Sequence, residues 1–96
     1  MLIVEINVIA TKLFKKQLWK SPVQIKEAVD AWLFTLGQVG LVETRKIKSY
    51  HDEPLQGDRF GQRSIRLNKA YRLFYSIHKE NEKIYLRLLE VNKHEY

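Results

Sequence analysis

Residues 62–93 read QRSIRLNKAYRLFYSIHKENEKIYLRLLEVNK, and this stretch decides the fold class of the 96-residue chain. Apolar and polar side chains alternate along three runs within it, as they do in half-buried β-strands. The runs are Gln62–Asn68, Tyr71–Lys79 and Lys83–Lys93, and the polar segment Glu80–Glu82 offers a turn between the last two. Three sequential strands with short connections predict a small, mainly antiparallel sheet.

The first forty residues add one strand and two helices to this prediction. Leu2–Val8 is an apolar run with β-branched residues, which is typical of a buried strand. Apolar residues recur at helical spacing through Thr11–Lys20. The segment Ser21–Gln24 (SPVQ) predicts the start of a second helix, because its serine, proline and glutamine fit a capping box. Helical spacing then continues as far as the segment Gly37–Gly40, whose glycines offer places to stop.

The resulting order of elements is β-α-α-β-β-β. It predicts an α+β fold in which a helical hairpin packs on one face of the sheet and leaves the other face open for a site. Leu41–Tyr50 fits either a short helix or an extended segment, and a polar loop follows at His51–Asp58. No repeat, low-complexity tract or linker divides the chain, so residues 1–96 are expected to form a single domain.

The composition excludes several kinds of site. The chain has no cysteine, which excludes disulfides, a thiolate nucleophile and a cysteine-ligated zinc site. Its three histidines, at positions 51, 78 and 94, lack the spacing of metal ligands, and no glycine-rich phosphate loop is present. We therefore expect no metal and no cofactor. Without an apolar run of ~20 residues or a signal peptide, we also expect a cytoplasmic protein with no membrane partner.

The positive charge is concentrated in the middle of the chain. The net charge is +6, and residues 41–72 carry eight Lys or Arg against four Asp or Glu. Such a patch attracts phosphates or acidic proteins. A basic surface that only keeps the protein soluble is the alternative.

Metal-free cleavage of RNA requires three kinds of group. A base removes the 2′-hydroxyl proton, cations stabilise the charge on the phosphate, and an acid protonates the departing 5′-oxygen. The candidates are Glu53 or His51 for the base, Arg63, Arg66 and Arg72 for the cations, and His94 for the acid. Because Ile65 and Leu67 share one strand face, Arg66 is expected on the opposite face.

Two segments resemble a known family. The run EPLQGDRFGQRSIRLNKAYRLFY (Glu53–Tyr75) and the ending EVNKHEY (Glu90–Tyr96) resemble the RelE/ParE superfamily of toxin–antitoxin systems. The nearest branches are the ribosome-dependent mRNA interferases HigB, YafQ and YoeB. The predicted order of elements is also that of the family, so the resemblance covers the whole chain, with its specific part at Glu53–Tyr96.

The resemblance implies a role for five residues. Glu53 resembles the general base of YoeB-like members, whose counterpart in YafQ-like members is a histidine. Arg66 takes the position that contacts the scissile phosphate, and Arg72 that of the arginine stabilising the transition state. His94 resembles the C-terminal general acid. Tyr96 resembles the aromatic that orients the substrate base, although one residue separates it from His94, whereas the YoeB ending places histidine and tyrosine side by side.

Each of these residues also has a plainer interpretation. Glu53 can be a solvated loop residue, and Arg66 an ordinary surface arginine. Arg72 can brace the sheet, because ParE-type gyrase inhibitors carry a similar tyrosine–arginine run. Four further cations are expected to hold phosphates of the message or of ribosomal RNA: Lys48, Arg63, Lys69 and Lys93.

The resemblance therefore implies the toxin of a type II toxin–antitoxin system, a ribosome-dependent mRNA endoribonuclease acting by 2′-hydroxyl attack. Its expected partners are messenger RNA, the ribosome and an antitoxin encoded by the adjacent gene. The alternative is a ParE-like toxin that binds and inhibits DNA gyrase without catalysis. An inactive basic interaction module is a third reading. The ending KHEY favours the nuclease, because a binding toxin needs no terminal acid.

Overall fold

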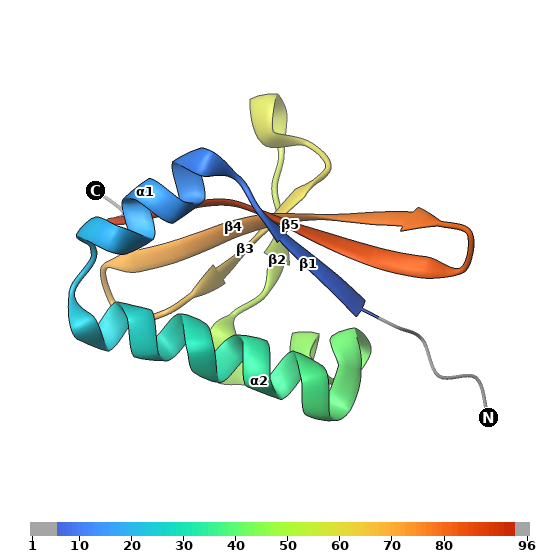
Figure 1. The fold of residues 1–96 in the computed structure, drawn as a ribbon, viewed down its shortest axis with the longest axis horizontal. Coiled ribbons are helices and arrows are strands. Elements are labelled where there is room, and N and C mark those ends of the chain that lie inside the picture. Colours follow the sequence, from blue (N-terminus) through green and yellow to red (C-terminus); the bar gives the residue numbers. More distant parts are fainter. Residues whose placement is uncertain (1–5, 94–96) are drawn as a thin grey trace.

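The computed structural model describes residues 6–93, which form two α-helices packed against one five-stranded sheet (Figure 1). The strands are β1 (Ile6–Ala10), β2 (Glu53–Pro54), β3 (Gln62–Arg66), β4 (Tyr71–Glu80) and β5 (Lys83–Lys93). The helices are α1 (Lys12–Lys20) and α2 (Val23–Arg45), with two short 3-10 helices, η1 (Lys48–Tyr50) and η2 (Gly57–Arg59). The predicted α+β fold is confirmed.

The sheet has the strand order β1-β5-β4-β3-β2. β1 runs parallel to β5, and every other neighbouring pair is antiparallel. Figure 1 shows α2 along one side of the sheet and the loop with η2 standing on the other side. We call the sheet face opposite α2 the open face. None of the helices within residues 6–93 is long and apolar enough to cross a membrane.

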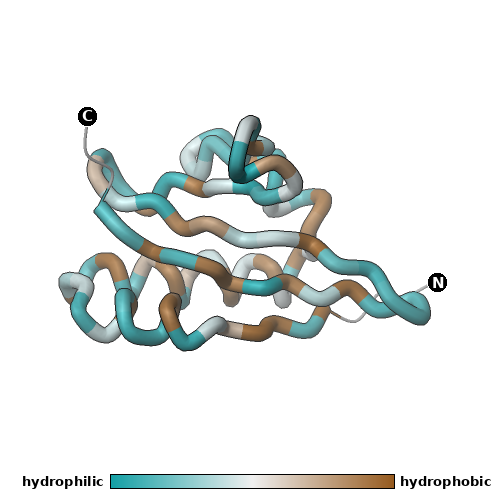
Figure 2. The backbone as a smooth tube through the Cα atoms, turned by 90° about the horizontal axis from the view of Figure 1, so that it is seen from above, coloured by the Kyte–Doolittle hydropathy of each residue, from teal (hydrophilic) through white to brown (hydrophobic). Residues whose placement is uncertain are grey.

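The core lies between α2 and the sheet. Ile25, Val29 and Trp32 follow one another at helical spacing and are all 1% exposed. They meet the apolar phase of the strands, in which Tyr75 is fully buried and its ring centroid lies 5.2 Å from that of Trp32. Figure 2 shows the corresponding alternation, with brown and teal segments following one another along the strands. Burial of this stripe holds α2 on the sheet.

Strand register divides the side chains between the two faces. The buried residues Ile65 and Leu73 pair across β3 and β4, and Leu73 pairs with Val91 of β5, so this row faces α2. Successive residues of a strand point to opposite faces. The rows on either side therefore lie on the open face: Ser64, Phe74 and Glu90 in one row, and Arg66, Arg72 and Asn92 in the next.

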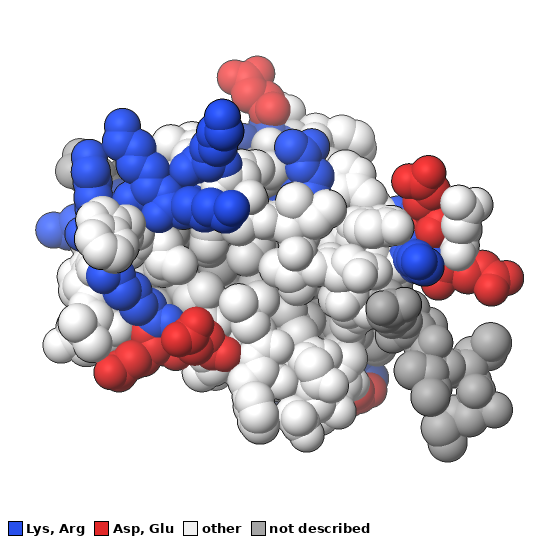
Figure 3. All heavy atoms as spheres, viewed as in Figure 1, with Lys and Arg blue, Asp and Glu red and all other residues white. Residues whose placement is uncertain are grey.

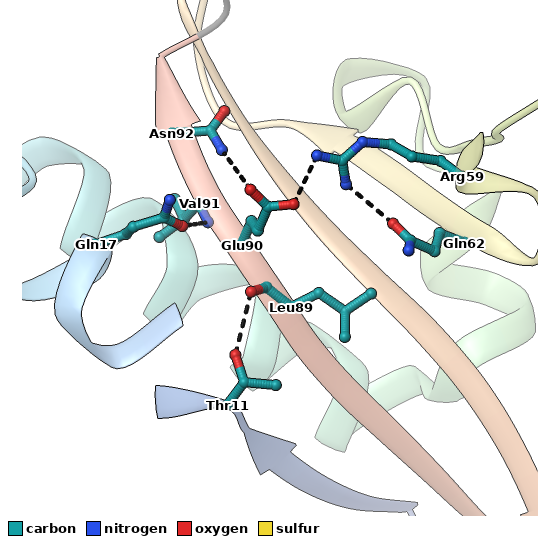
Figure 4. A network of polar contacts seen from close by, with 8 residues as sticks. All are labelled: Thr11, Gln17, Arg59, Gln62, Leu89, Glu90, Val91 and Asn92. Atoms are coloured by element: carbon teal, nitrogen blue, oxygen red, sulfur yellow. Dashed lines mark hydrogen bonds and ion pairs between the residues drawn. The ribbon is translucent and has the colours of Figure 1, made fainter. Parts of the chain in front are cut away.

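Side chains of α1 replace a strand beside the second half of β5. Pairing between β1 and β5 ends at Ala10 and Leu88, and an irregular register follows at the level of Phe74 and Tyr75. Beyond that point the Thr11 hydroxyl donates to the Leu89 carbonyl, and the Val91 amide donates to the Gln17 side chain (Figure 4). Unpaired backbone groups at a strand edge are costly, so these two bonds allow β5 to extend to Lys93.

The predicted hairpin turn agrees with the structure, whereas the predicted start of the second helix does not. The predicted turn joins β4 and β5 through Asn81 and Glu82, both with positive φ, as a two-residue hairpin loop requires. The predicted capping box at Ser21 is wrong. Ser21 ends α1, since its hydroxyl donates to the Gln17 carbonyl, and Pro22 precedes α2 with no side-chain cap.

The ends of β1 and α2 also differ from the sequence-based limits. β1 is described from Ile6 and ends at Ala10, two residues beyond the expected strand, whereas residues 2–5 of that expectation lie outside the described part. α2 passes Gly37 and breaks at Gly40, whose φ of 84° only glycine adopts readily. A further helical turn follows as far as Arg45, so the expected short helix is present in part of Leu41–Tyr50.

A buried ion pair fastens the loop before β2 to the core side of the sheet. The Asp52 side chain is 2% exposed and accepts a 2.6 Å hydrogen bond from Arg63 Nε. The Tyr75 hydroxyl donates to the other oxygen of the same carboxylate. Burial, the hydrogen bond to Asp52 and its charge together raise the pKa of Tyr75 above its ordinary range.

This raised pKa predicts that the protein loses folding stability at alkaline pH when Tyr75 ionises. Its folded-state pKa lies above the unfolded value of about 10. The stabilisation is thus complete below about pH 10 and is lost as the pH rises toward the folded-state pKa. Tyr75→Phe should be less stable than the wild type at about pH 8, because Asp52 loses a hydrogen bond. We expect this difference in unfolding free energy to narrow toward about pH 11.

Urea denaturation across this pH range measures the difference, with Tyr85→Phe as the control for loss of a tyrosine elsewhere in the sheet. A difference between the Tyr75→Phe and wild-type proteins that stays constant up to about pH 11 would contradict the prediction.

Candidate active site

β2 brings the candidate base onto the open face. Glu53 pairs with Ser64 of β3, and Pro54 pairs with Arg63. Asp52 precedes Glu53 and is directed to the core side by Arg63 and Tyr75. Because neighbouring residues of an extended chain alternate, anchoring Asp52 on one side places Glu53 on the other. The sequence did not predict β2, which has only two residues.

Arg72 connects Glu53 to the sheet. Its Nη1 atom lies 3.3 Å from Glu53 Oε1 and donates a 2.9 Å hydrogen bond to Ser64 Oγ. The Arg72 side chain is 15% exposed, and Ser64 is fully buried beneath it. The expected cation and the expected base are therefore in direct contact. Ser64 orients the guanidinium. The sequence analysis missed this role, because a small polar residue on a strand carries no signal of it.

His51 lies on the outer side of the same carboxylate. Its Nε2 atom is 3.3 Å from Glu53 Oε2, and both side chains are about half exposed. His51 follows η1 with a φ of 46°, in the left-handed region that residues other than glycine adopt at a cost. The two alternative bases of the sequence analysis are thus neighbours, and a proton held by one is within reach of the other.

Arg66 and Arg72 form the cationic part of the site. They are direct cross-strand partners on the open face, and Arg66 is exposed. Like charges directly opposite each other in a sheet repel. An anion bound between them removes this repulsion, so the pair is suited to a phosphate. Asn92 pairs with Arg72 from β5 and extends the same polar row.

Arg63 differs from its expected role. Its side chain is 18% exposed and lies on the α2 side of the sheet, bound to Asp52. Burial lowers the pKa of Arg63, but the hydrogen bond and charge of Asp52 outweigh this effect and raise it. This corrects the expectation that Arg63 holds a phosphate, because its guanidinium serves the buried ion pair. Nothing in the sequence distinguished Arg63 from the nearby Arg66 and Arg72, because Asp52 could not be recognised as its partner.

The other expected RNA-binding residues are exposed but separate. Lys48 lies in η1, Lys69 in the turn between β3 and β4, and Lys93 at the end of β5. His94 and Tyr96 lie outside the described residues. In residues 6–93, no three His, Asp or Glu side chains cluster closely enough to hold a metal ion.

The basic surface extends beyond the middle third of the chain. Figure 3 shows Lys and Arg side chains gathered over α1 and near the η2 loop. The α1 lysines are all exposed: Lys12, Lys15, Lys16 and Lys20. The Gln17 bond to Val91 holds α1 beside the end of β5, the strand that carries Asn92. Cations from the two halves of the sequence therefore lie at the same end of the sheet.

Comparisons with known proteins identify the fold. No family model and no curated protein matches the sequence. Among solved structures, the chain is similar to the YoeB/ParE toxin from Agrobacterium tumefaciens, with a TM-score of 0.72, 15% identity and coverage of 93% of this chain and 99% of that one. YafQ from E. coli gives a TM-score of 0.72 and 18% identity, with 93% of each chain covered.

A third similar structure is the toxin–antitoxin complex RelBE2 from Mycobacterium tuberculosis. The TM-score is 0.66 at 26% identity, and the match covers 94% of this chain and 99% of that chain. These neighbours share the order and packing of elements that the sequence predicted. The chain therefore has the fold of the RelE/ParE superfamily of toxins, as the resemblance at Glu53–Tyr96 implied.

Proposed function

We propose that this protein is the toxin of a type II toxin–antitoxin system and cleaves messenger RNA on the ribosome without a metal. The contact of Arg72 with Glu53 is the observation that carries the proposal. Because Arg66 lies directly opposite Arg72, a proton acceptor and two cations lie together on the open face. The resemblance to mRNA interferases supports the same function.

Glu53 is proposed to start the reaction by accepting the 2′-hydroxyl proton. The 2′-oxygen then attacks the adjacent phosphorus, which yields a 2′,3′-cyclic phosphate and a 5′-hydroxyl. The nucleophile belongs to the RNA, so the protein supplies only position, charge and proton transfer. His51 lies 3.3 Å from Glu53 and can receive the proton in turn or act as the base itself.

Arg66 and Arg72 are proposed to bind the scissile phosphate. Negative charge builds on its non-bridging oxygens as the 2′-oxygen attacks, and fixed cations stabilise that charge. Arg72 is held by Ser64 and Glu53, so little rearrangement is needed when the substrate binds. Arg66 is exposed and completes the phosphate contact from β3.

His94 is proposed as the acid that protonates the departing 5′-oxygen, and Tyr96 as the aromatic that orients a base. Both assignments rest on the ending EVNKHEY and its resemblance to the family. Lys93, the residue before His94, ends β5 two strands away from Arg66. Lys48, Lys69 and Lys93 are proposed to hold phosphates of the message or of ribosomal RNA, and the cytoplasm is the corresponding location.

The central test is expression of the chain in bacteria. We expect growth arrest with messages cut inside translated regions, and cut ends that carry a 2′,3′-cyclic phosphate and a 5′-hydroxyl. Purified protein should give the same ends on ribosome-bound message in the presence of a metal chelator. Arg66→Ala is the matched inactive control, because this exposed residue contributes little to the fold. Intact messages together with inhibited DNA gyrase would assign the protein to the ParE type instead.

The acid can be tested by His94→Gln. Glutamine forms hydrogen bonds but cannot donate a proton at neutral pH, so single-turnover cleavage should fall by about 10²- to 10⁴-fold. The thermal midpoint should stay close to that of the wild type. His78→Gln is the control, since His78 lies on β4 and bonds to Ser76 rather than to the site. Full activity of His94→Gln would remove this residue from the mechanism.

A protein partner is also proposed, namely an acidic antitoxin encoded by the adjacent gene. The similar structures include toxin–antitoxin complexes such as RelBE2 and DinJ–YafQ. The net charge of +6 favours an acidic partner, and complementary charge accelerates encounter. We expect the neighbouring small protein to co-purify with this chain, to block cleavage, and to associate more slowly as salt rises. A co-purified toxin that stays fully active, or no co-purification, would refute this.

A further inference from the structure

An arginine covers an aromatic ring on the open face of the sheet. Phe74 points to the open face, opposite α2, yet it is only 9% exposed. The guanidinium of Arg59 provides the cover, with its central carbon 4.3 Å from the centroid of the Phe74 ring. Arg59 belongs to η2, in the loop that stands above this face (Figure 1). A planar cation is thus layered on an aromatic ring beside the candidate active site.

Two polar side chains fix the Arg59 guanidinium in place. Nη2 donates a 2.6 Å hydrogen bond to Glu90 Oε2, and Nη1 donates a 3.0 Å bond to Gln62 Oε1. Figure 4 shows Arg59 reaching across from its loop to β5, with Asn92 on the far side of the Glu90 carboxylate. These bonds use the edge of the guanidinium, and the ring uses one of its faces. The Arg59 side chain remains 39% exposed, so it can still be reached from solvent above the Phe74 ring.

The charge of this group argues against a phosphate ligand. Glu90 neutralises Arg59 at 2.6 Å, and the exposed Asp58 precedes it in the loop. A phosphate approaching the Arg59 guanidinium would therefore also meet the Glu90 carboxylate. A nucleobase has no such conflict, because it stacks on the flat face of a guanidinium without requiring its charge.

We propose that Arg59, layered on Phe74 and held by Glu90, is a stacking platform for a nucleobase next to the scissile phosphate. Phe74 lies two residues from Arg72 on the same face of β4, about 7 Å along the strand. A nucleotide flanking a phosphate bound at Arg72 can reach the platform. The inference rests on the proposed RNA cleavage and adds to it the site that orients the RNA beside the cut.

The test compares intact message with message in which one nucleotide next to the cut is abasic. Arg59→Lys keeps a cation beside Glu90 but lacks a planar face. We expect it to lower kcat/KM on intact ribosome-bound message by about 5- to 150-fold, the range of one stacked base. The wild type should lose a similar factor on the abasic message, and Arg59→Lys should lose nothing further there. Arg87→Lys is the control and should behave as wild type, because this exposed arginine of β5 pairs with Ser76 rather than with Phe74.

Equal kcat/KM of Arg59→Lys and wild type on intact message would overturn the proposal. So would a loss of the same size on intact and abasic message, because Arg59 would then only cover Phe74. A second measurement does not depend on cleavage. The measurement uses a 2′-O-methyl RNA that carries the fluorescent base 2-aminopurine. Its fluorescence should be quenched when the base stacks on the wild-type protein, and this quenching should be absent with Arg59→Lys. Quenching that depends on Arg59 without any cleavage would retain the platform and reject the nuclease, whereas quenching unaffected by Arg59→Lys would reject the platform.

Discussion

The buried Asp52–Arg63 pair is the constraint on which the site depends. A carboxylate that is 2% exposed is costly unless a cation and hydrogen bonds compensate it, and Arg63 and Tyr75 provide both. Once Asp52 is held on the core side, chain alternation commits Glu53 to the open face. Tyr75 in turn packs on Trp32 of α2. The position of the candidate base is therefore tied to the packing of the helix on the far side of the sheet.

β4 serves the core with one face and the site with the other. Leu73 and Tyr75 are fully buried against α2. On the other face, Arg72 contacts Glu53, and Phe74 lies under the Arg59 guanidinium. This division explains how a chain with 15–26% identity to its structural neighbours retains their fold. Substitutions in the polar phase of the strand change the chemistry of the open face without altering the packing beneath it.

Much of this architecture follows from local patterns in the sequence. Alternation over Tyr71–Lys79 and Lys83–Lys93 fixed both long strands, and Arg66 was correctly assigned to the face opposite Ile65. The failures involve contacts distant in sequence. Arg63 was assigned to RNA because its partner Asp52 is eleven residues away, and Ser21 had two adjacent helices that it could cap. Local spacing cannot choose between such partners, because the choice depends on tertiary packing.

The polar groups of the open face suit the proposed reaction, in which the RNA carries its own nucleophile. Arg66 and Arg72 are like charges directly opposite each other on neighbouring strands, and the phosphate of the proposed reaction would remove the repulsion between them. Glu53 relieves part of that cost at Arg72, which keeps the guanidinium in place before RNA arrives. In the proposed reaction, Glu53 would lose its negative charge on accepting the 2′-hydroxyl proton. Arg72 would then be free to direct its charge to the phosphate, where negative charge is increasing. The proposed mechanism would thus couple proton transfer to phosphate stabilisation through the one contact between Glu53 and Arg72.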